Sequence, residues 1–137
     1  MSQDRATFQQ LAEERLAEAR ALLKAGHPSG AYYLAGYAVE CALKAKIAMQ
    51  FRANEIPDRS LVNKAYDHDF NKLLQLARLR DENYTALYTD EALRRRWTIA
   101  AKWKPDSRYK VWSFNEATDL VEAVGGDRGL MQWLLNL

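Results

Sequence analysis

The fold is decided by residues 31–45, which read AYYLAGYAVECALKA. Large apolar side chains fall on more than one face of a helix with 3.6 residues per turn, and small residues lie between them. A helix that is apolar on several faces belongs at the centre of a bundle, because a surface helix keeps one polar face. We therefore predict a central helix from Ser29 to about Phe51.

The flanking sequence predicts further helices on both sides of this one. An amphipathic helix precedes it, with an apolar stripe that includes Leu11 and Leu16, and it ends at Gly26 and Pro28. Later helices are predicted from near Asp67, where the carboxylate can cap free amides, from Thr89 to Lys102, from near Phe114, where Ser113 and Glu116 have capping-box spacing, and from Gly129 to Leu135. A loop at Asn54–Asn63, a turn at Pro105–Ser107 and a break at Gly125–Gly126 separate them. No segment alternates as a strand does, so we predict an all-α, up-down bundle of four to five helices with a short C-terminal helix, forming one domain over residues 1–137.

The composition is that of an ordinary folded domain. The chain has 137 residues, of which 48% are hydrophobic and 28% charged, so it can bury a core and cover it with a polar surface. The first ten residues do not resemble a signal peptide, and Glu40, Lys44 and Lys46 interrupt the most apolar stretch, so we expect no membrane span. The single cysteine, Cys41, permits no internal disulfide, which indicates a cytoplasmic protein.

The usual motifs for metals, phosphates and cofactors are missing. Gly125-Gly126 lacks the lysine and serine or threonine of a phosphate-binding loop. Two histidines and one cysteine, far apart in sequence, do not form a zinc-binding set. We therefore expect neither a metal site nor a cofactor.

Three segments, taken in order, resemble the HEPN family. They are residues 31–45, the His68-Asp69-Phe70 element after the loop, and the stretch from Trp103 that ends in Arg108-Tyr109 before the last long helix. The resemblance covers nearly the whole chain and implies a bundle of four or five helices that usually dimerises. Many members are ribonucleases or toxins, often encoded beside a small nucleotidyltransferase that neutralises them. Others are inactive and serve as nucleotide-binding or assembly domains.

Catalytic members of that family carry arginine, four to six residues, and then histidine in the last long helix. Histidine moves protons near neutral pH and arginine holds phosphate. Here no histidine follows Arg108, and His68 is the last in the chain. Arg20 and His27 have the required spacing but lie at the end of the first helix, where His27 could simply favour the helix dipole. The resemblance thus implies an inactive module, with Arg20, His27, His68 and Arg108 as the remaining catalytic candidates.

The other polar residues of interest allow two interpretations each. In one, Asp67 and Asp69 cap a helix while His68 packs or bonds locally. In the other, His68, next to Asp69, lines a nucleotide or RNA groove with Arg108 and Tyr109. Glu40 and Lys44, four residues apart, form either a helix-surface pair or a polar pocket or dimer seam.

Basic residues are concentrated between Arg94 and Lys110. This segment holds seven basic residues and Asp106, a net charge of +6, which leaves −4 for the rest of a chain whose total is +2. The basic residues are Arg94, Arg95, Arg96, Lys102, Lys104, Arg108 and Lys110, and Trp97, Trp103, Tyr109 and Trp112 are interleaved with them. Cations with aromatic rings are typical of single-stranded nucleic-acid grooves, but a solvated helix face with inward tryptophans has the same pattern.

These observations lead to three hypotheses. The first is a HEPN-like, non-catalytic module that binds a nucleotide, RNA or a nucleotidyltransferase partner in a toxin–antitoxin or defence-type system, as a homodimer. The second is a divergent, metal-independent ribonuclease toxin that uses His68 or His27 with an arginine. The third is a structural protein-interaction domain without a ligand.

Overall fold

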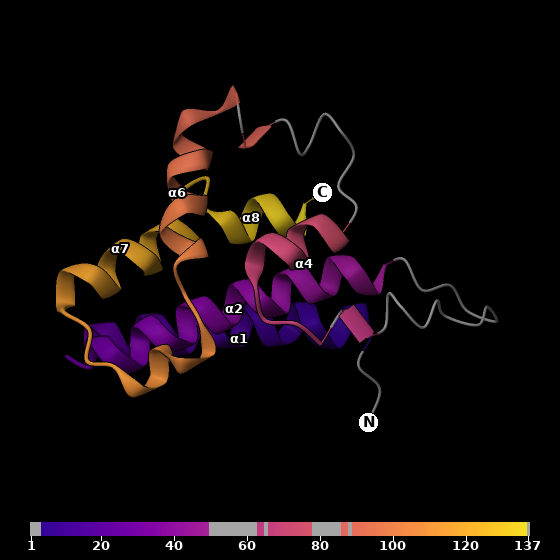
Figure 1. Ribbon diagram of the computed structural model, residues 1–137. Helices are drawn as coiled ribbons and strands as arrows, with labels where there is room; N and C mark the ends of the chain where they lie inside the picture. The colour runs from indigo at the N-terminus through magenta and orange to yellow at the C-terminus, as the bar shows by residue number, and fades with distance from the viewer. Residues whose placement is uncertain (1–3, 50–62, 65, 78–85, 88, 137) are drawn as a thin grey trace.

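The computed structural model describes residues 4–49, 63–64, 66–77, 86–87 and 89–136. Helices α1 (Arg5–Lys24) and α2 (Pro28–Ala48) form a hairpin and lie side by side along their length (Figure 1). Asp4 caps α1 by accepting a hydrogen bond from the Thr7 amide at 2.9 Å. Between the helices, Gly26 has a φ of +87°, the left-handed conformation that favours glycine. Pro28 then begins α2, as the sequence predicts.

Helix α2 is the centre of the molecule. It packs against α1, α4, α7, α8 and the short 3-10 helix η1. Its alanines at positions 31, 35, 38 and 42 are fully buried, so that neighbouring helices approach it closely. The predicted central helix is therefore confirmed. It ends at Ala48, with Met49 as its C-cap, and the expected end at Phe51 lies outside the described residues.

Two later helices of the described residues begin after the predicted positions. Helix α4 covers Phe70–Leu76 and α6 covers Glu91–Ala101. The cap of α4 is Asp69, whose carboxylate accepts hydrogen bonds from the amides of Asn71 and Lys72, and not Asp67. Most of the predicted loop Asn54–Asn63 lies outside the described residues.

The C-terminal part follows the predicted capping signals. After α6, the predicted turn is a 3-10 helix, η1 (Pro105–Tyr109). Helix α7 (Phe114–Gly125) opens on the predicted capping box, in which the Ser113 hydroxyl accepts from the Glu116 amide at 3.1 Å and the Glu116 carboxylate accepts from the Ser113 amide at 3.0 Å. Helix α8 (Leu130–Leu135) follows.

The described residues contain helices and no strand, which confirms the all-α class. Figure 1 shows α6 steeply inclined to the α1–α2 pair, with α7 and α8 beside it. Among the described helices, none is long and apolar enough to cross a membrane.

Aromatic rings fill the space between α2, α4 and the end of α6. Trp103 is buried and stacks on Phe70, with ring centroids 5.4 Å apart and planes inclined by 15°. Its indole lies directly over Gly36 of α2, where a Cβ atom would come within 2.1 Å of the ring. Gly36 thus provides the space that Trp103 occupies.

Candidate functional site

The most unusual polar group of the described structure is Glu40, a buried carboxylate in the middle of α2. One of its oxygens lies 2.6 Å from Nδ1 of His68, and the other lies 3.6 Å from Nζ of Lys44. The Glu40 side chain is only 6% exposed, so these two partners compensate for the loss of water around the charge. The predicted Glu40–Lys44 pair is present, and the structure adds His68 to it.

The backbone before α4 positions His68. The Asp67 carboxylate accepts hydrogen bonds from the amides of His68, at 2.7 Å, and Asp69, at 2.9 Å. The bond from the Asp69 amide is the main reason why the pKa of Asp67 is lowered, so this carboxylate stays ionised. With Nδ1 facing Glu40, the other nitrogen of the half-exposed His68 ring remains available to a ligand.

A pocket of about 390 Å³ opens beside His68, and we call it the His68 pocket. Its polar lining is His68, Asp69 and Asn71 on one side and Lys104 and Asp106 on the other, and Phe70 and Trp103 also line it. The volume is in the range of small-molecule sites, which combine a few polar groups with an apolar lining. The Asn71 oxygen accepts a hydrogen bond from the Trp97 indole at 3.0 Å, which leaves its NH₂ group for other partners.

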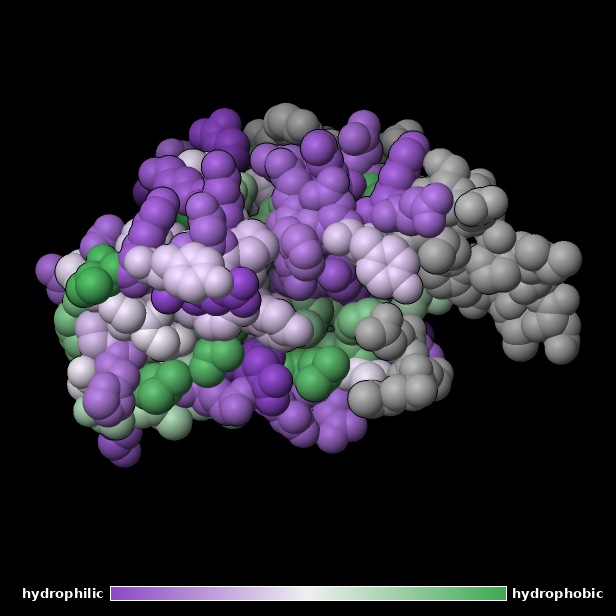
Figure 2. Space-filling model, turned by 60° about the horizontal axis from the view of Figure 1, so that its bottom comes forward, coloured by the Kyte–Doolittle hydropathy of each residue, from purple (hydrophilic) through white to green (hydrophobic). Residues whose placement is uncertain are grey.

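Arg108 and Tyr109 lie on η1, next to α2. The guanidinium carbon of Arg108 is 4.8 Å from the centroid of the Tyr109 ring. Hydrogen bonding to Tyr109, and to a smaller extent to Tyr33 of α2, raises the pKa of Arg108, so its charge is permanent. Tyr33 in turn stacks on Trp103, with centroids 5.8 Å apart. Arg108 is therefore linked through Tyr33 to an aromatic ring that lines the His68 pocket. Figure 2 shows the molecule with the bottom of Figure 1 turned forward, where purple, hydrophilic residues lie above and below a band of pale and green ones.

The arginine run of α6 belongs mainly to a different surface. Arg95 and Arg96 line a groove of about 510 Å³ between α6 and α7, which also contains Asp119 and Glu122. Arg96 donates a hydrogen bond to the Asp127 carbonyl at 3.3 Å. Arg94 and Lys102 are exposed on the same helix and at its end. The basic segment is thus divided, with Lys104 on the His68 pocket and Arg95 and Arg96 elsewhere.

The tryptophans of the basic segment are mostly core residues. Trp97 and Trp103 are buried, and Trp112 stacks on Tyr32 with ring centroids 3.7 Å apart. The backbone N–H of Trp112 donates to the Ser29 hydroxyl, and its indole N–H donates to the Ser107 carbonyl. Of the two interpretations of this segment, the one with inward tryptophans therefore describes Trp97 and Trp103, and Tyr109 is 76% exposed to solvent.

The members of the second candidate pair, Arg20 and His27, form no hydrogen bond with each other among the described residues, and the two side chains have different surroundings. The Arg20 guanidinium donates to the carbonyl of Gly125 and so holds the end of α7. His27 is the exposed N-cap residue of α2, and its side chain makes no capping hydrogen bond.

Sequence reasoning did not mention Asn71, and it did not place Asp106, Phe70 or Trp103 in one site with His68. Phe70 and Asn71 are two and three residues after His68, so their proximity to it could have been inferred from the start of α4. Lys104 was seen only as one of seven basic residues. No sequence signal brings η1 next to α4, because that contact depends on the packing of both against α2.

No group of three or more His, Cys, Asp or Glu side chains within the described residues is placed to hold a metal ion. Comparisons of this chain with protein-family models, with curated proteins and with solved structures gave no match.

Proposed function

We propose that this protein is a HEPN-like helical module that binds a nucleotide or RNA at the His68 pocket, without cleaving it. The observation that carries the proposal is the 2.6 Å contact of His68 with the buried Glu40 at the edge of a pocket that Lys104 also lines. A cation next to a pocket of this size suits a phosphate-bearing ligand, and the carboxylates and Asn71 can bind base or ribose groups.

Arg108 and Tyr109 extend this surface in the proposal. Arg108 is exposed and permanently charged, and Tyr109 beside it offers an open ring face to a base. An RNA strand would place phosphates on Lys104 and Arg108 and a base on Tyr109, the combination that single-stranded nucleic-acid sites use.

Fluorescence anisotropy with a labelled single-stranded RNA of about 12 nucleotides tests this proposal, since such sites span roughly 4–16 nucleotides. We expect the logarithm of the affinity to fall linearly with the logarithm of salt concentration. Lys104→Ala and Arg108→Ala should each reduce the slope by about 0.7, the value for one phosphate contact in a single strand. Lys24→Ala, which removes the same charge from the last turn of α1, is the matched control. Equal slopes for Lys104→Ala, Arg108→Ala and the control would contradict the assignment of the site.

A divergent, metal-independent ribonuclease is the second candidate, and the His68–Glu40 contact favours it. A carboxylate that holds Nδ1 of an imidazole orients the ring so that Nε2 can act as a base. His68 would remove the proton of a ribose 2′-hydroxyl, whose oxygen attacks the adjacent phosphorus. The P–O5′ bond breaks, a cyclic phosphate forms, and the leaving oxygen takes a proton from solvent.

The two candidates differ in an assay of RNA cleavage by purified protein in the presence of EDTA. Binding without cleavage supports the non-catalytic module. Cleavage that His68→Ala and Glu40→Gln abolish, and that His27→Ala leaves intact, supports the ribonuclease. A domain that only contacts proteins would show neither.

The resemblance to the HEPN family leads us to propose that the protein forms a homodimer and that its protein partner is a small nucleotidyltransferase. Sedimentation equilibrium of the purified chain tests the dimer. Co-purification with a co-expressed nucleotidyltransferase, retained at high salt, tests the partner.

A further inference from the structure

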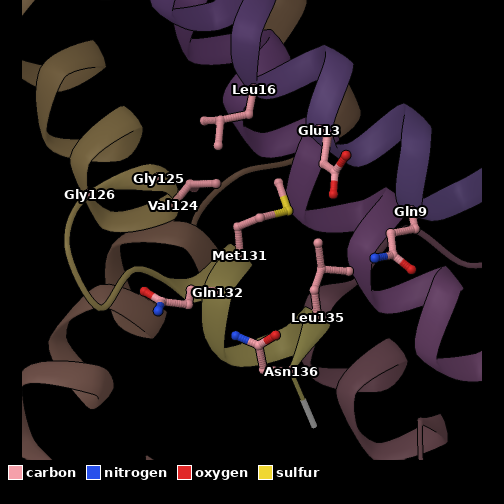
Figure 3. Close-up of a pocket in the computed structure, with 10 residues that line it drawn as sticks. All are labelled: Gln9, Glu13, Leu16, Val124, Gly125, Gly126, Met131, Gln132, Leu135 and Asn136. Carbon is pink, nitrogen blue, oxygen red and sulfur yellow. The ribbon is translucent and has the colours of Figure 1, made fainter.

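A second pocket, of about 290 Å³, lies between α1, the end of α7 and α8 (Figure 3). None of the residues that line it also lines the His68 pocket, so it is a separate site. We call it the α1–α8 pocket.

Four polar side chains surround the α1–α8 pocket. Gln9 and Glu13 are one turn apart on α1, and Gln132 and Asn136 are one turn apart on α8. Figure 3 shows the two pairs on opposite sides, with Met131 and Leu135 between them. None of these four side chains forms a hydrogen bond or ion pair with another residue of the described chain. Their donors and acceptors are therefore open to a ligand.

The electrostatics of this pocket favour a cation. Glu13 is the one charged residue among the described residues that line it. Helix α8 also ends here, at Leu135, and the C-terminal end of a helix carries a partial negative charge. The carbonyl of Gly125 at the end of α7 is already bound by the guanidinium of Arg20, so the attraction for a cation comes from Glu13 and the end of α8.

We propose that the α1–α8 pocket binds a small alkylammonium ion. An ammonium group has three N–H donors, which match the Glu13 carboxylate and the side-chain oxygens of the neighbouring amides. The aliphatic part of the ligand would lie on Met131 and Leu135, both of which are at least partly buried. The proposal does not depend on the RNA site, because the two pockets share no residue.

Titration of the ¹⁵N-labelled full chain with n-butylammonium chloride, followed by NMR, tests the proposal. We expect chemical-shift changes at the backbone amides of α1 and α8 around the pocket, with millimolar affinity. The neutral analogue n-butanol should bind at least tenfold more weakly. Glu13→Gln should weaken the binding of n-butylammonium at least tenfold. Glu14→Gln is the matched control, since Glu14 is the next residue on α1, accepts a hydrogen bond from Gln10 and does not line the pocket.

A gain of affinity gives an independent check. Gln132→Glu adds a second carboxylate across the pocket and should tighten the binding of n-butylammonium several-fold. Circular dichroism of each variant verifies that it is folded. Equal affinity for n-butanol, unchanged binding by Glu13→Gln, or shifts confined to other parts of the chain would overturn the proposal.

Discussion

Glu40 shows how one residue can be predicted in part. The spacing of Glu40 and Lys44 in an apolar helix identifies them from sequence as a pair, because residues four apart lie on one face. His68, 28 residues later, completes the cluster at 2.6 Å from the Glu40 carboxylate. Helical periodicity carries no information on a contact across a loop of that length, so the third member appears only in the structure.

Cys41, the neighbour of Glu40, lies in the core and has an unusual ionisation. Burial, with a smaller contribution from the negative charge of Glu40, raises the pKa of the Cys41 thiol to about 11. The ordinary pKa of a cysteine thiol is near 9. Between pH 9 and pH 11, Cys41 therefore keeps its proton in the folded protein and loses it in the unfolded chain. The free energy of unfolding should therefore fall as the pH rises from 9 to 11, by up to about 3 kcal/mol from this group.

Urea unfolding of wild-type protein and Cys41→Ala at several pH values measures this effect. The difference between the two free energies should change with pH above 9 and stay constant below it. A constant difference over the whole range would show that the thiol has an ordinary pKa in the folded protein.

At the scale of elements, the close contact between α2 and Trp103, two residues after α6, depends on Gly36. A Cβ atom at this position would lie 2.1–2.2 Å from the indole of Trp103, whose ring is fixed by its stacking on Phe70 and Tyr33. Gly36→Ala should therefore displace Trp103 and destabilise the protein by about 1–3 kcal/mol, the usual cost of overpacking a core.

Gly30, on the same helix, provides the control. Its added Cβ would meet only the end of the Leu22 side chain, at 3.1 Å, which can move. Gly30→Ala should leave stability unchanged or raise it by up to about 1 kcal/mol, because alanine has the better helix propensity. Thermal unfolding compares the two variants, and an equal effect of both substitutions would contradict the role of Gly36.

The start of a helix could be predicted where only one nearby residue is suited to cap it. Ser113 and Glu116 form the only capping box expected at α7, and the helix begins there. Before α4, Asp67 and Asp69 both suit a cap, and the structure uses them differently. Asp67 binds the amides of His68 and Asp69 in a turn, and Asp69 caps the helix. The sequence contains both signals but does not rank them.

At the scale of the whole molecule, the basic segment illustrates the difference between clustering in sequence and in space. Its seven cations lie within a stretch of seventeen residues, from 94 to 110. The chain changes direction between α6 and η1, so Arg95 faces the α7 groove and Lys104 lines the His68 pocket. The number of charges was predictable from sequence, but their division between surfaces depends on the packing of α6.

Arg20 links the first helix to a helix near the C-terminus, since its guanidinium on α1 donates to the Gly125 carbonyl at the end of α7. Arg20→Ala should lower the free energy of unfolding by about 1 kcal/mol, the typical net value of one hydrogen bond, because exposure to solvent offsets the added strength of the charge. It should leave RNA affinity at the His68 pocket unchanged. Urea unfolding and RNA anisotropy on the same variant measure both. A stable variant that has lost RNA affinity would instead assign Arg20 to the ligand site.

The stacked pair of Tyr32 and Trp112 gives this protein an internal optical probe. Two rings 3.7 Å apart and inclined by 12° couple electronically, so the folded protein should have a strong near-ultraviolet circular dichroism signal from this pair. Trp112 lies in the connection between η1 and α7, and Tyr32 belongs to α2. The signal therefore reports whether this connection is packed against the central helix. A ligand or partner that lifts this connection would be detected without any attached label.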